Sequence, residues 1–165
     1  MIRPFVPEDA EELTALLVAN REAFEPVTPD RPEDWYTLPF QRRRLEGFLE
    51  QEGWFFAILD GDEIAGSLNI GDVVGGAVQL ANLGYWVDRA RYGRGLATRA
   101  VAEACAFAFG EAGLHRLEAG TLPDNVASQR VLEKNGFTRF GVARGLVRIG
   151  GEWRDHVLFE RLATD

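Results

Sequence analysis

Hydrophobic residues recur along this chain with two different spacings, and each change of spacing marks the boundary of an expected element. Runs of bulky and β-branched residues bounded by turn residues are typical of strands. Such runs cover residues 2–5, 54–59, 64–70, 78–87, 114–121, 137–148 and 152–162. Apolar residues at helical spacing predict one helix after Pro7, a second over residues 96–109 and a third over residues 126–135.

Glycine pairs and a proline-rich segment place the turns between these elements. Asp-Gly at 60–61 and Gly-Gly at 75–76 and 150–151 predict hairpin turns. Residues 20–40 are rich in proline and predict a mobile loop, which leads into a charged helix from Gln41 toward Glu52. The order of elements predicts one α/β (α+β) domain over residues 1–165. We expect a mixed, mostly antiparallel sheet of about six or seven strands, flanked by about four helices on both faces.

The composition fits one compact domain and narrows the class of partner. The chain has 165 residues, 46% of them apolar, with a net charge of −8 and a pI of about 4.9. Its one basic run, residues 42–44, is followed by Glu46, Glu50 and Glu52 and is expected to be a solvated helix face. Without a larger basic patch, no nucleic-acid partner is expected.

The single cysteine and the absence of long apolar segments suggest the compartment. Cys105 lies in an apolar helical run and is expected to pack in the core, so no intrachain disulfide can form. No segment resembles a signal peptide or a membrane span, and no Cys/His cluster has the spacing of a metal site. We therefore expect a cytoplasmic protein, monomeric or homodimeric, with no membrane partner and no metal.

The segment after the strand at 78–87 carries the clearest chemical signal. A glycine-bearing turn runs directly into the helix at 96–109. Backbone N–H groups and the positive end of the helix dipole converge there, which suits a diphosphate, and Gly93 and Gly95 remove side chains that would block close approach. No Lys-Ser or Lys-Thr pair follows, as a Walker A loop requires, and Thr98 stands where a dinucleotide fingerprint wants glycine or alanine. Glycines that simply start a helix are the structural alternative.

A second polar pair opens the helix at 126–135. Asn125 and Ser128 are three residues apart, so an amide and a hydroxyl share one face of the helix. Taken alone, the pair is equally consistent with an ordinary N-cap followed by a polar first turn. Its position after the glycine turn favours a shared site.

These segments together resemble the GNAT acetyltransferases, and the resemblance spans nearly the whole chain. The family turn Gln/Arg-Xaa-Xaa-Gly-Xaa-Gly/Ala matches residues 92–97, with Tyr92 departing at the first position. The resemblance implies acetyl-CoA as co-substrate, gripped at its diphosphate mainly by backbone N–H groups, with Asn125 on the pantetheine arm and Ser128 near the sulfur. The cofactor-binding residues that it implies are Trp86, Val87, Tyr92, Gly93, Arg94, Gly95, Leu96, Ala97, Thr98, Asn125 and Ser128.

Within this family the chain looks most like the RimJ/RimL branch, and in particular its RimJ members. The matching segments are residues 19–21, 25–27, 83–86 and 151–158. The branch implies acetylation of the N-terminal amino group, alanine or serine, of a protein such as a ribosomal protein, by direct attack in a ternary complex. Two alternatives stay open. One is acetylation of a small amine such as a polyamine, an aminoglycoside or an amino acid; the other is a non-catalytic domain that senses acyl-CoA.

Acetyl transfer from the thioester to an amine needs a hydrogen-bond donor to the carbonyl oxygen, a proton for the departing thiolate and an amine in its neutral form. The resemblance places the donor, a backbone N–H, near Trp86 and Val87, and Ser128 is the candidate to protonate the thiolate. Many relatives carry a glutamate where this chain has Asn82, which cannot accept a proton at neutral pH but can align a water. A weak base suits an α-amine, because deprotonation at pH 7 costs roughly 1 kcal/mol, against about 4.6 kcal/mol for a lysine.

Aromatic residues and one histidine are expected to line the acceptor site. Trp35 and Tyr36 either line it or anchor the proline-rich loop to the core. Tyr85 and His156 are the other candidates. Asp155 and His156 are neighbours in an expected strand and point to opposite faces, so Asp155 should not orient the histidine for catalysis.

Overall fold

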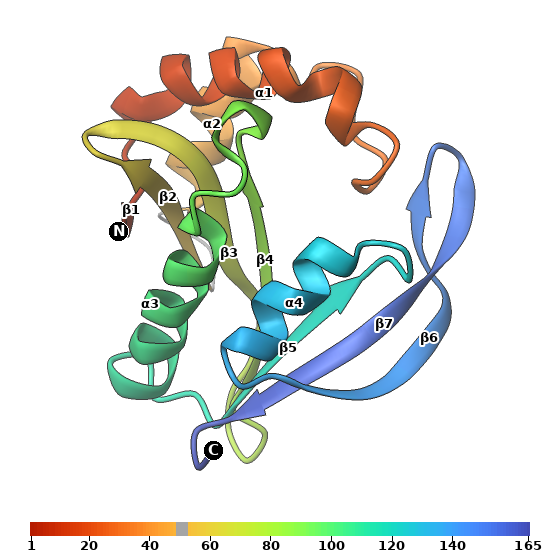
Figure 1. Cartoon of the computed structure of the whole chain (residues 1–165). Coiled ribbons are helices and arrows are strands. Elements are labelled where there is room, and N and C mark those ends of the chain that lie inside the picture. Colours follow the sequence, from red (N-terminus) through yellow and green to blue (C-terminus); the bar gives the residue numbers. More distant parts are fainter. Residues whose placement is uncertain (49–52) are drawn as a thin grey trace.

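A seven-stranded sheet organises the chain, and helices cover both of its faces (Figure 1). The computed structural model describes residues 1–48 and 53–165. The strands lie in the order β1-β2-β3-β4-β5-β7-β6. The neighbours β4 and β5 are parallel, and the other described pairs are antiparallel. The predicted mixed, mostly antiparallel sheet is confirmed.

The elements follow the order that the hydrophobic pattern predicts. The strands are β1 (Ile2–Pro4), β2 (Trp54–Asp60), β3 (Glu63–Val74), β4 (Leu80–Val87), β5 (Arg116–Thr121), β6 (Thr138–Ile149) and β7 (Glu152–Leu162). The helices are α1 (Ala10–Phe24), α2 (Leu38–Phe48), α3 (Leu96–Gly110) and α4 (Val126–Lys134), with 3-10 turns η1 (Pro7–Asp9) and η2 (Arg89–Arg91). Gly136, with a φ of 78°, follows the C-cap Asn135 and ends α4. Glu50 and Glu52, at the end of the charged helix predicted from Gln41, lie outside the described residues.

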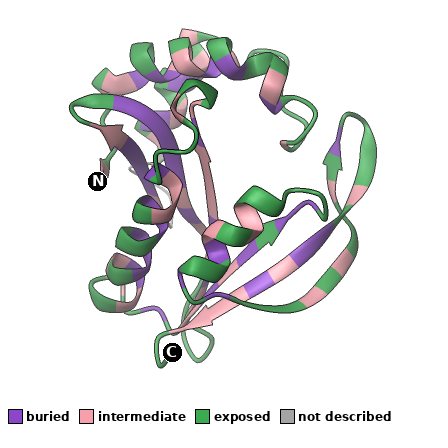
Figure 2. Ribbon diagram, in the orientation of Figure 1, coloured by how far each residue is buried: buried purple, intermediate pink, exposed green. Residues whose placement is uncertain are grey.

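Each face of the sheet has its own hydrophobic core (Figure 2). On one face, strand residues such as Leu68 and Leu117 meet the buried side of α3, where Cys105 packs as predicted. On the other face, Leu13 of α1 and Leu45 of α2 pack over β2 and β3. We call these the α3 face and the α1 face.

Strand β4 shows how alternation divides its residues between the two faces. Ala81, Leu83 and Val87 belong to the core on the α3 face. Trp86 packs instead on the α1 face against Phe24, with ring centroids 5.1 Å apart. Because successive side chains of a strand point to opposite faces, odd-numbered residues of β4 point to the α3 face and even-numbered residues to the α1 face.

The proline-rich loop between α1 and α2 is anchored to the β6–β7 hairpin. The Asp30 N–H donates to Arg148 O at 2.9 Å. The Asp30 carboxylate accepts from Gly151 N at 3.2 Å and pairs with Arg148 Nε at 3.3 Å. These contacts, which the spacing of residues does not reveal, hold the segment for which the sequence predicts mobility.

The basic run of α2 is only partly solvated. Arg42 and Arg43 are exposed, as predicted. For Arg44 the prediction is wrong: its guanidinium lies 4.6 Å from the Trp35 ring centroid and 4.3 Å from that of Phe55. Burial lowers the pKa of Arg44 to about 10. A guanidinium is weakly hydrated and stacks on aromatic rings, which explains how the Arg44 side chain can pack over Trp35.

Gly66 on β3 lies in tight contact with β4 and gives a test of this packing. A Cβ at Gly66 would lie 2.2 Å from Trp86 O, whereas one at Gly71 would meet Asn69 Nδ2 at 3.6 Å. We expect Gly66→Ala to lower the free energy of unfolding by about 3 kcal/mol, because backbone atoms must move. The matched Gly71→Ala variant should change it by less than about 1 kcal/mol. Urea unfolding followed by circular dichroism measures both, and equal stability of the two variants would contradict the prediction.

Candidate active site

Strands β4 and β5 separate near the centre of the sheet. Their parallel pairing ends at Asn82 and Glu118, although β4 continues to Val87 and β5 to Thr121. Figure 1 shows the two strands diverging beyond this point, with α4 beside the β5 arm. One edge of β4 is therefore left without a strand partner in the part of the chain that the structure describes.

Backbone polar groups of β4 face this divergence. Asp88 N donates to Ala65 O of β3 at 2.7 Å, which fixes the alternation of hydrogen bonds between the two antiparallel strands. By that alternation, Tyr85 and Val87, which lie beyond the end of the pairing with β5, direct their N–H and C=O groups away from β3, toward the divergence. The row includes Val87 N–H, at the position where the sequence predicts a donor to the carbonyl oxygen. These groups need partners, since unpaired backbone polar groups are costly to bury.

The glycine turn lies between the end of β4 and α3. Gly93 and Gly95 have φ angles of 79° and 73°, in the left-handed region that glycine adopts without strain. Gly95 is the N-cap of α3, so the first helical N–H groups face the space in front of the turn. A Cβ on Gly93 would meet no atom within 4 Å, and one on Gly95 would meet Arg99 Nη1 at 3.7 Å. This open space before a helix N-terminus has the geometry of an anion site.

The other residues expected to bind the cofactor occupy different depths around the turn. Tyr92, at the position where the family has glutamine or arginine, is 61% exposed. Leu96 is buried, and Ala97 is partly buried against the core on the α3 face. Thr98 O accepts a hydrogen bond from Asn135 Nδ2 at 3.1 Å, which ties α3 to the end of α4.

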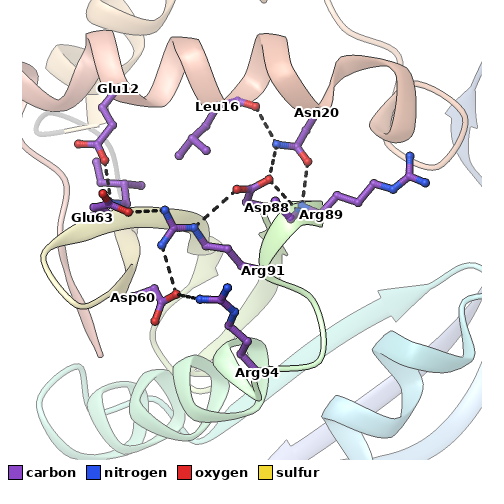
Figure 3. Close-up of polar contacts among 11 residues, drawn as sticks. Glu12, Leu16, Asn20, Asp60, Glu63, Asp88, Arg89, Arg91 and Arg94 are labelled. Atoms are coloured by element: carbon purple, nitrogen blue, oxygen red, sulfur yellow. Dashed lines mark hydrogen bonds and ion pairs between the residues drawn. The ribbon is translucent and has the colours of Figure 1, made fainter.

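A charged network fixes the turn to the β2–β3 hairpin (Figure 3). Arg91 donates to Asp60 at 3.2 Å and to Glu63 at 2.5 Å, and its Nε lies 3.6 Å from the Asp88 carboxylate. The hydrogen bonds from Arg91 to Glu63 and Asp60 raise the pKa of its guanidinium. Arg94 contacts the same Asp60 carboxylate at 2.8 Å. The two arginines of the turn are thus held by carboxylates of a neighbouring hairpin.

Asn20 ties the same turn to α1. Its buried Nδ2 donates to Asp88 Oδ1 and to Leu16 O, both at 3.0 Å, and its Oδ1 accepts from Arg89 N at 2.9 Å. None of the motifs identified in the sequence predicts that Asn20 connects α1 to the turn. A polar residue on the inner side of an amphipathic helix is the available signal, because a buried amide must find hydrogen-bond partners.

Asn125 and Ser128 meet at the start of α4, where Tyr85 reaches them from β4. Asn125 Oδ1 caps the helix by accepting from Ser128 N at 3.1 Å. Ser128 Oγ lies 2.8 Å from Tyr85 Oη, which also contacts Ser128 O at 3.2 Å. Burial raises the pKa of Tyr85 to about 12, so the phenol stays protonated near neutral pH. The structure therefore bridges the two diverging arms with a pair of hydroxyl groups.

The side chain of Tyr85, which the sequence predicts to line the acceptor site, lies on the α3 face beside Ser128. The side chain of Trp86, expected at the cofactor, lies on the α1 face. Alternation along β4 is the signal that separates the two neighbours, because Leu83 and Val87 are core residues. By the alternation along β4, the N–H and C=O groups of Trp86 face its register neighbour Ser67 on β3.

Asn82 lies on the α1 face at the point where the strands part. It is exposed, and its Nδ2 donates to Asp72 Oδ2 of β3 at 3.2 Å. Its register neighbour on β5 is Glu118, whose carboxylate accepts from Arg116 Nε at 2.7 Å. The sequence singled out Asn82 but not Asp72, because a contact between strands depends on their register.

His156 also lies on the α1 face, buried beside Gly120. Its Nδ1 is 3.3 Å from Arg154 O. Asp155 instead accepts from Gly145 N at 2.8 Å. The expectation that Asp155 does not orient His156 is confirmed.

A cavity of about 450 Å³ opens between the α1–α2 loop and the β6–β7 hairpin. Its lining includes Arg31, Tyr36 and Gly150. Trp35 is buried under the loop, where it packs against Phe40 at 5.2 Å between ring centroids. Of the two aromatic residues, Trp35 therefore anchors the loop and Tyr36 faces the cavity.

Residues 1–48 and 53–165 contain no cluster of three or more histidine, cysteine, aspartate or glutamate side chains that could hold a metal ion. None of the helices described in these residues has the length and apolar character needed to cross a membrane.

Known proteins are similar to this chain in sequence and in fold. The family model "Acetyltransferase (GNAT) domain" matches residues 1–138. The chain is 39% identical to the probable N-acetyltransferase YjcK of Bacillus subtilis (strain 168), over 99% of this chain and 94% of that protein. It is 32% identical to the ribosomal protein uS5-alanine N-acetyltransferase of Escherichia coli (strain K12), over 96% of this chain and 84% of that protein.

A solved structure extends the similarity to the fold. Mycobacterium smegmatis RimJ in complex with CoA-disulfide is 33% identical, has a TM-score of 0.93, and matches over 99% of this chain and 81% of that chain. The glycine turn, the diverging strands and the Tyr85–Ser128 bridge are thus found in a chain whose whole length matches acetyltransferases. The chain belongs to the GNAT acetyltransferase family, in its RimJ/RimL branch, and is an N-acetyltransferase.

Proposed function

We propose that this enzyme transfers the acetyl group of acetyl-CoA to the N-terminal α-amino group of a protein, with an alanine or serine terminus of a ribosomal protein as acceptor. The observation that carries the proposal is the divergence of β4 and β5, bridged by Tyr85 and Ser128 and ended by the glycine turn. The relative from Escherichia coli, named for the alanine of uS5, supports the acceptor. The CoA-disulfide bound by Mycobacterium smegmatis RimJ supports the cofactor.

Acetyl-CoA would lie along the exposed edge of β4. The N–H groups before α3 and the helix dipole suit its diphosphate. The N–H and C=O groups of Tyr85 and Val87 could then pair with the amides of the pantetheine arm, so that the cofactor takes the place of a missing strand. Asn125, at the start of α4, offers its Nδ2 from the opposite arm.

The reaction must move two protons. An α-ammonium group carries three protons, and the amide product keeps one of them. One proton leaves to solvent, the nitrogen lone pair attacks the thioester carbonyl carbon, and the C–S bond breaks. The second proton reaches the thiolate, while Val87 N–H stabilises the negative charge that develops on the carbonyl oxygen.

Ser128 is suited to protonate the departing sulfur. The phenol of Tyr85 stays protonated, because burial raises its pKa to about 12, and it can donate to Ser128 Oγ. A hydroxyl that accepts one hydrogen bond keeps its own proton to donate. Transfer within a ternary complex needs no covalent acetyl-enzyme.

The acceptor side supports an α-amine. Asn82 replaces the carboxylate that many relatives carry, and an α-amine is cheaper to deprotonate than a lysine by roughly 3.6 kcal/mol at pH 7. The net charge of −8 favours a basic partner such as the N-terminal segment of a ribosomal protein. Cytoplasmic location follows from this acceptor.

Release of CoA from acetyl-CoA with a panel of acceptors tests the proposed function. We expect turnover with basic peptides that begin with alanine or serine, and slower turnover with the same peptides blocked at the N-terminus, spermidine or free lysine. Preferential turnover of spermidine would contradict the peptide acceptor. Tight binding of acetyl-CoA without any turnover would contradict catalysis itself.

The glycine turn predicts a selective loss of cofactor affinity in Gly95→Val. A branched side chain at φ 73° would fill the space in front of the first N–H groups of α3. We expect acetyl-CoA binding, measured by calorimetry, to weaken by about tenfold or more, which corresponds to roughly 1.4 kcal/mol.

Gly113→Val is the matched control for Gly95→Val. Gly113 has a φ of 65° with nothing within 4 Å of its Cβ position, so the valine carries the same backbone strain away from the turn. Its affinity for acetyl-CoA should equal that of the wild type. Equal affinities of both variants would place the cofactor elsewhere.

Ser128 predicts a loss of rate without a loss of cofactor binding. Removal of the hydroxyl in Ser128→Ala should lower kcat by about 100-fold, the order expected for a lost proton donor. The capping contact from Ser128 N to Asn125 is retained because it uses the backbone. Steady-state kinetics and calorimetry measure the two quantities, and parallel losses in both would remove the assignment of Ser128 as proton donor.

A further inference from the structure

Asp72 has an unusual backbone conformation beside the point where β4 and β5 part. Its φ of 51° is in the left-handed region, which non-glycine residues seldom adopt. The register of β3 against β4 is irregular between Gly71 and Val74, so Asp72 sits in a bulge. Bulges redirect side chains and are common next to active sites.

The bulge brings the Asp72 carboxylate to Asn82. Asn82 Nδ2 donates to Asp72 Oδ2 at 3.2 Å. Since an ionised carboxylate can only accept, this contact fixes the amide with Nδ2 toward Asp72 and leaves Oδ1 free to accept a hydrogen bond. The Asn82 amide thus connects the Asp72 carboxylate to the point where β4 and β5 stop pairing.

The charged groups of β5 and β7 that lie next to Asn82 are already engaged. Alternation along β5 and β7 places Arg116, Glu118 and Glu160 on the α1 face with Asn82. Arg116 donates to Glu118 at 2.7 Å and also pairs with Glu160. Strand β4 itself contains no charged residue. Asp72 has no ion pair with any described residue, so its negative charge is not offset by a neighbouring cation.

We propose that Asp72 is the proton acceptor of the acetyl transfer and that Asn82 positions the Asp72 carboxylate toward the acceptor amine. The inference rests on the proposed function, because it names the missing base of that reaction. Asn82 Oδ1 and Asp72 together order one water beside the α-ammonium. The water takes one ammonium proton and passes its own to the Asp72 carboxylate, which releases it to solvent. The freed lone pair then attacks the acetyl carbonyl. As the C–S bond breaks, Ser128 donates its hydroxyl proton to the thiolate and takes up the second proton from the nitrogen, so that the products are the amide and the CoA thiol.

The pH dependence of Asp72→Asn separates this role from a structural one. Asparagine tolerates the left-handed region well and is nearly isosteric, so the bulge should persist. The variant can use only amine that is already neutral. At pH 6.5 we expect kcat/KM to fall by about 100-fold. At pH 9, above the α-amine pKa of about 8, the variant should come within about threefold of the wild type.

A second variant supplies the carboxylate at the position that Asn82 occupies. In Asp72→Asn with Asn82→Glu, kcat/KM at pH 6.5 should return to within about tenfold of the wild type. Glu118→Gln tests the neighbouring carboxylate, and Glu111→Gln at the end of α3 is the control for loss of an exposed negative charge. Glu111→Gln should match the wild type at every pH.

The assay uses the full chain, acetyl-CoA and the amine that the wild type acetylates fastest, with released CoA measured from pH 6 to 9.5. A deficit in Asp72→Asn that is the same at every pH would overturn the proposal, as would a pH-dependent deficit found in Glu118→Gln but not in Asp72→Asn. Turnover of small amines alone would contradict the proposed acceptor while the Asp72 comparison still holds. No turnover of any amine would overturn both.

Discussion

Strand β4 stops pairing with β5 after Asn82 and Glu118, although both strands continue. Sheets normally end their hydrogen bonding at an edge, where solvent satisfies the backbone. Here the interruption lies inside the sheet, between strands held firmly on their other sides by β3 and β7. The separation of β4 from β5 leaves a row of backbone N–H and C=O groups on β4 that an extended ligand can pair with, as a strand would. The proposed path of acetyl-CoA follows from it.

The two arms of the divergence keep their positions through different contacts. On the β4 side, Asn20 and Arg91 fix the glycine turn to α1 and to the β2–β3 hairpin. On the β5 side, Asn125 caps α4, and the Tyr85–Ser128 contact joins the arms at 2.8 Å. Such preorganisation matters because donors that are already oriented do not have to reorganise as charge develops.

Much of this arrangement could be predicted from local sequence. Glycine at 93 and 95 and the cap at Asn125 act through their own backbone neighbourhood, so their roles are visible in a few residues of chain. The contacts of Asp30, Asn20 and Asp72 could not be predicted in this way, because they depend on segments far apart in sequence. Arg44 shows the same limit: a basic run indicates a solvated face until the position of Trp35 and Phe55 is known.

The most direct measurement is a crystal structure of the enzyme with acetyl-CoA bound. The thioester should lie between β4 and β5, its carbonyl oxygen within hydrogen-bond distance of Val87 N and its sulfur within reach of Ser128 Oγ. The diphosphate should contact the N–H groups around Gly93 and Gly95. Acetyl-CoA bound elsewhere, with β4 and β5 unoccupied between their diverging arms, would contradict this interpretation of the fold.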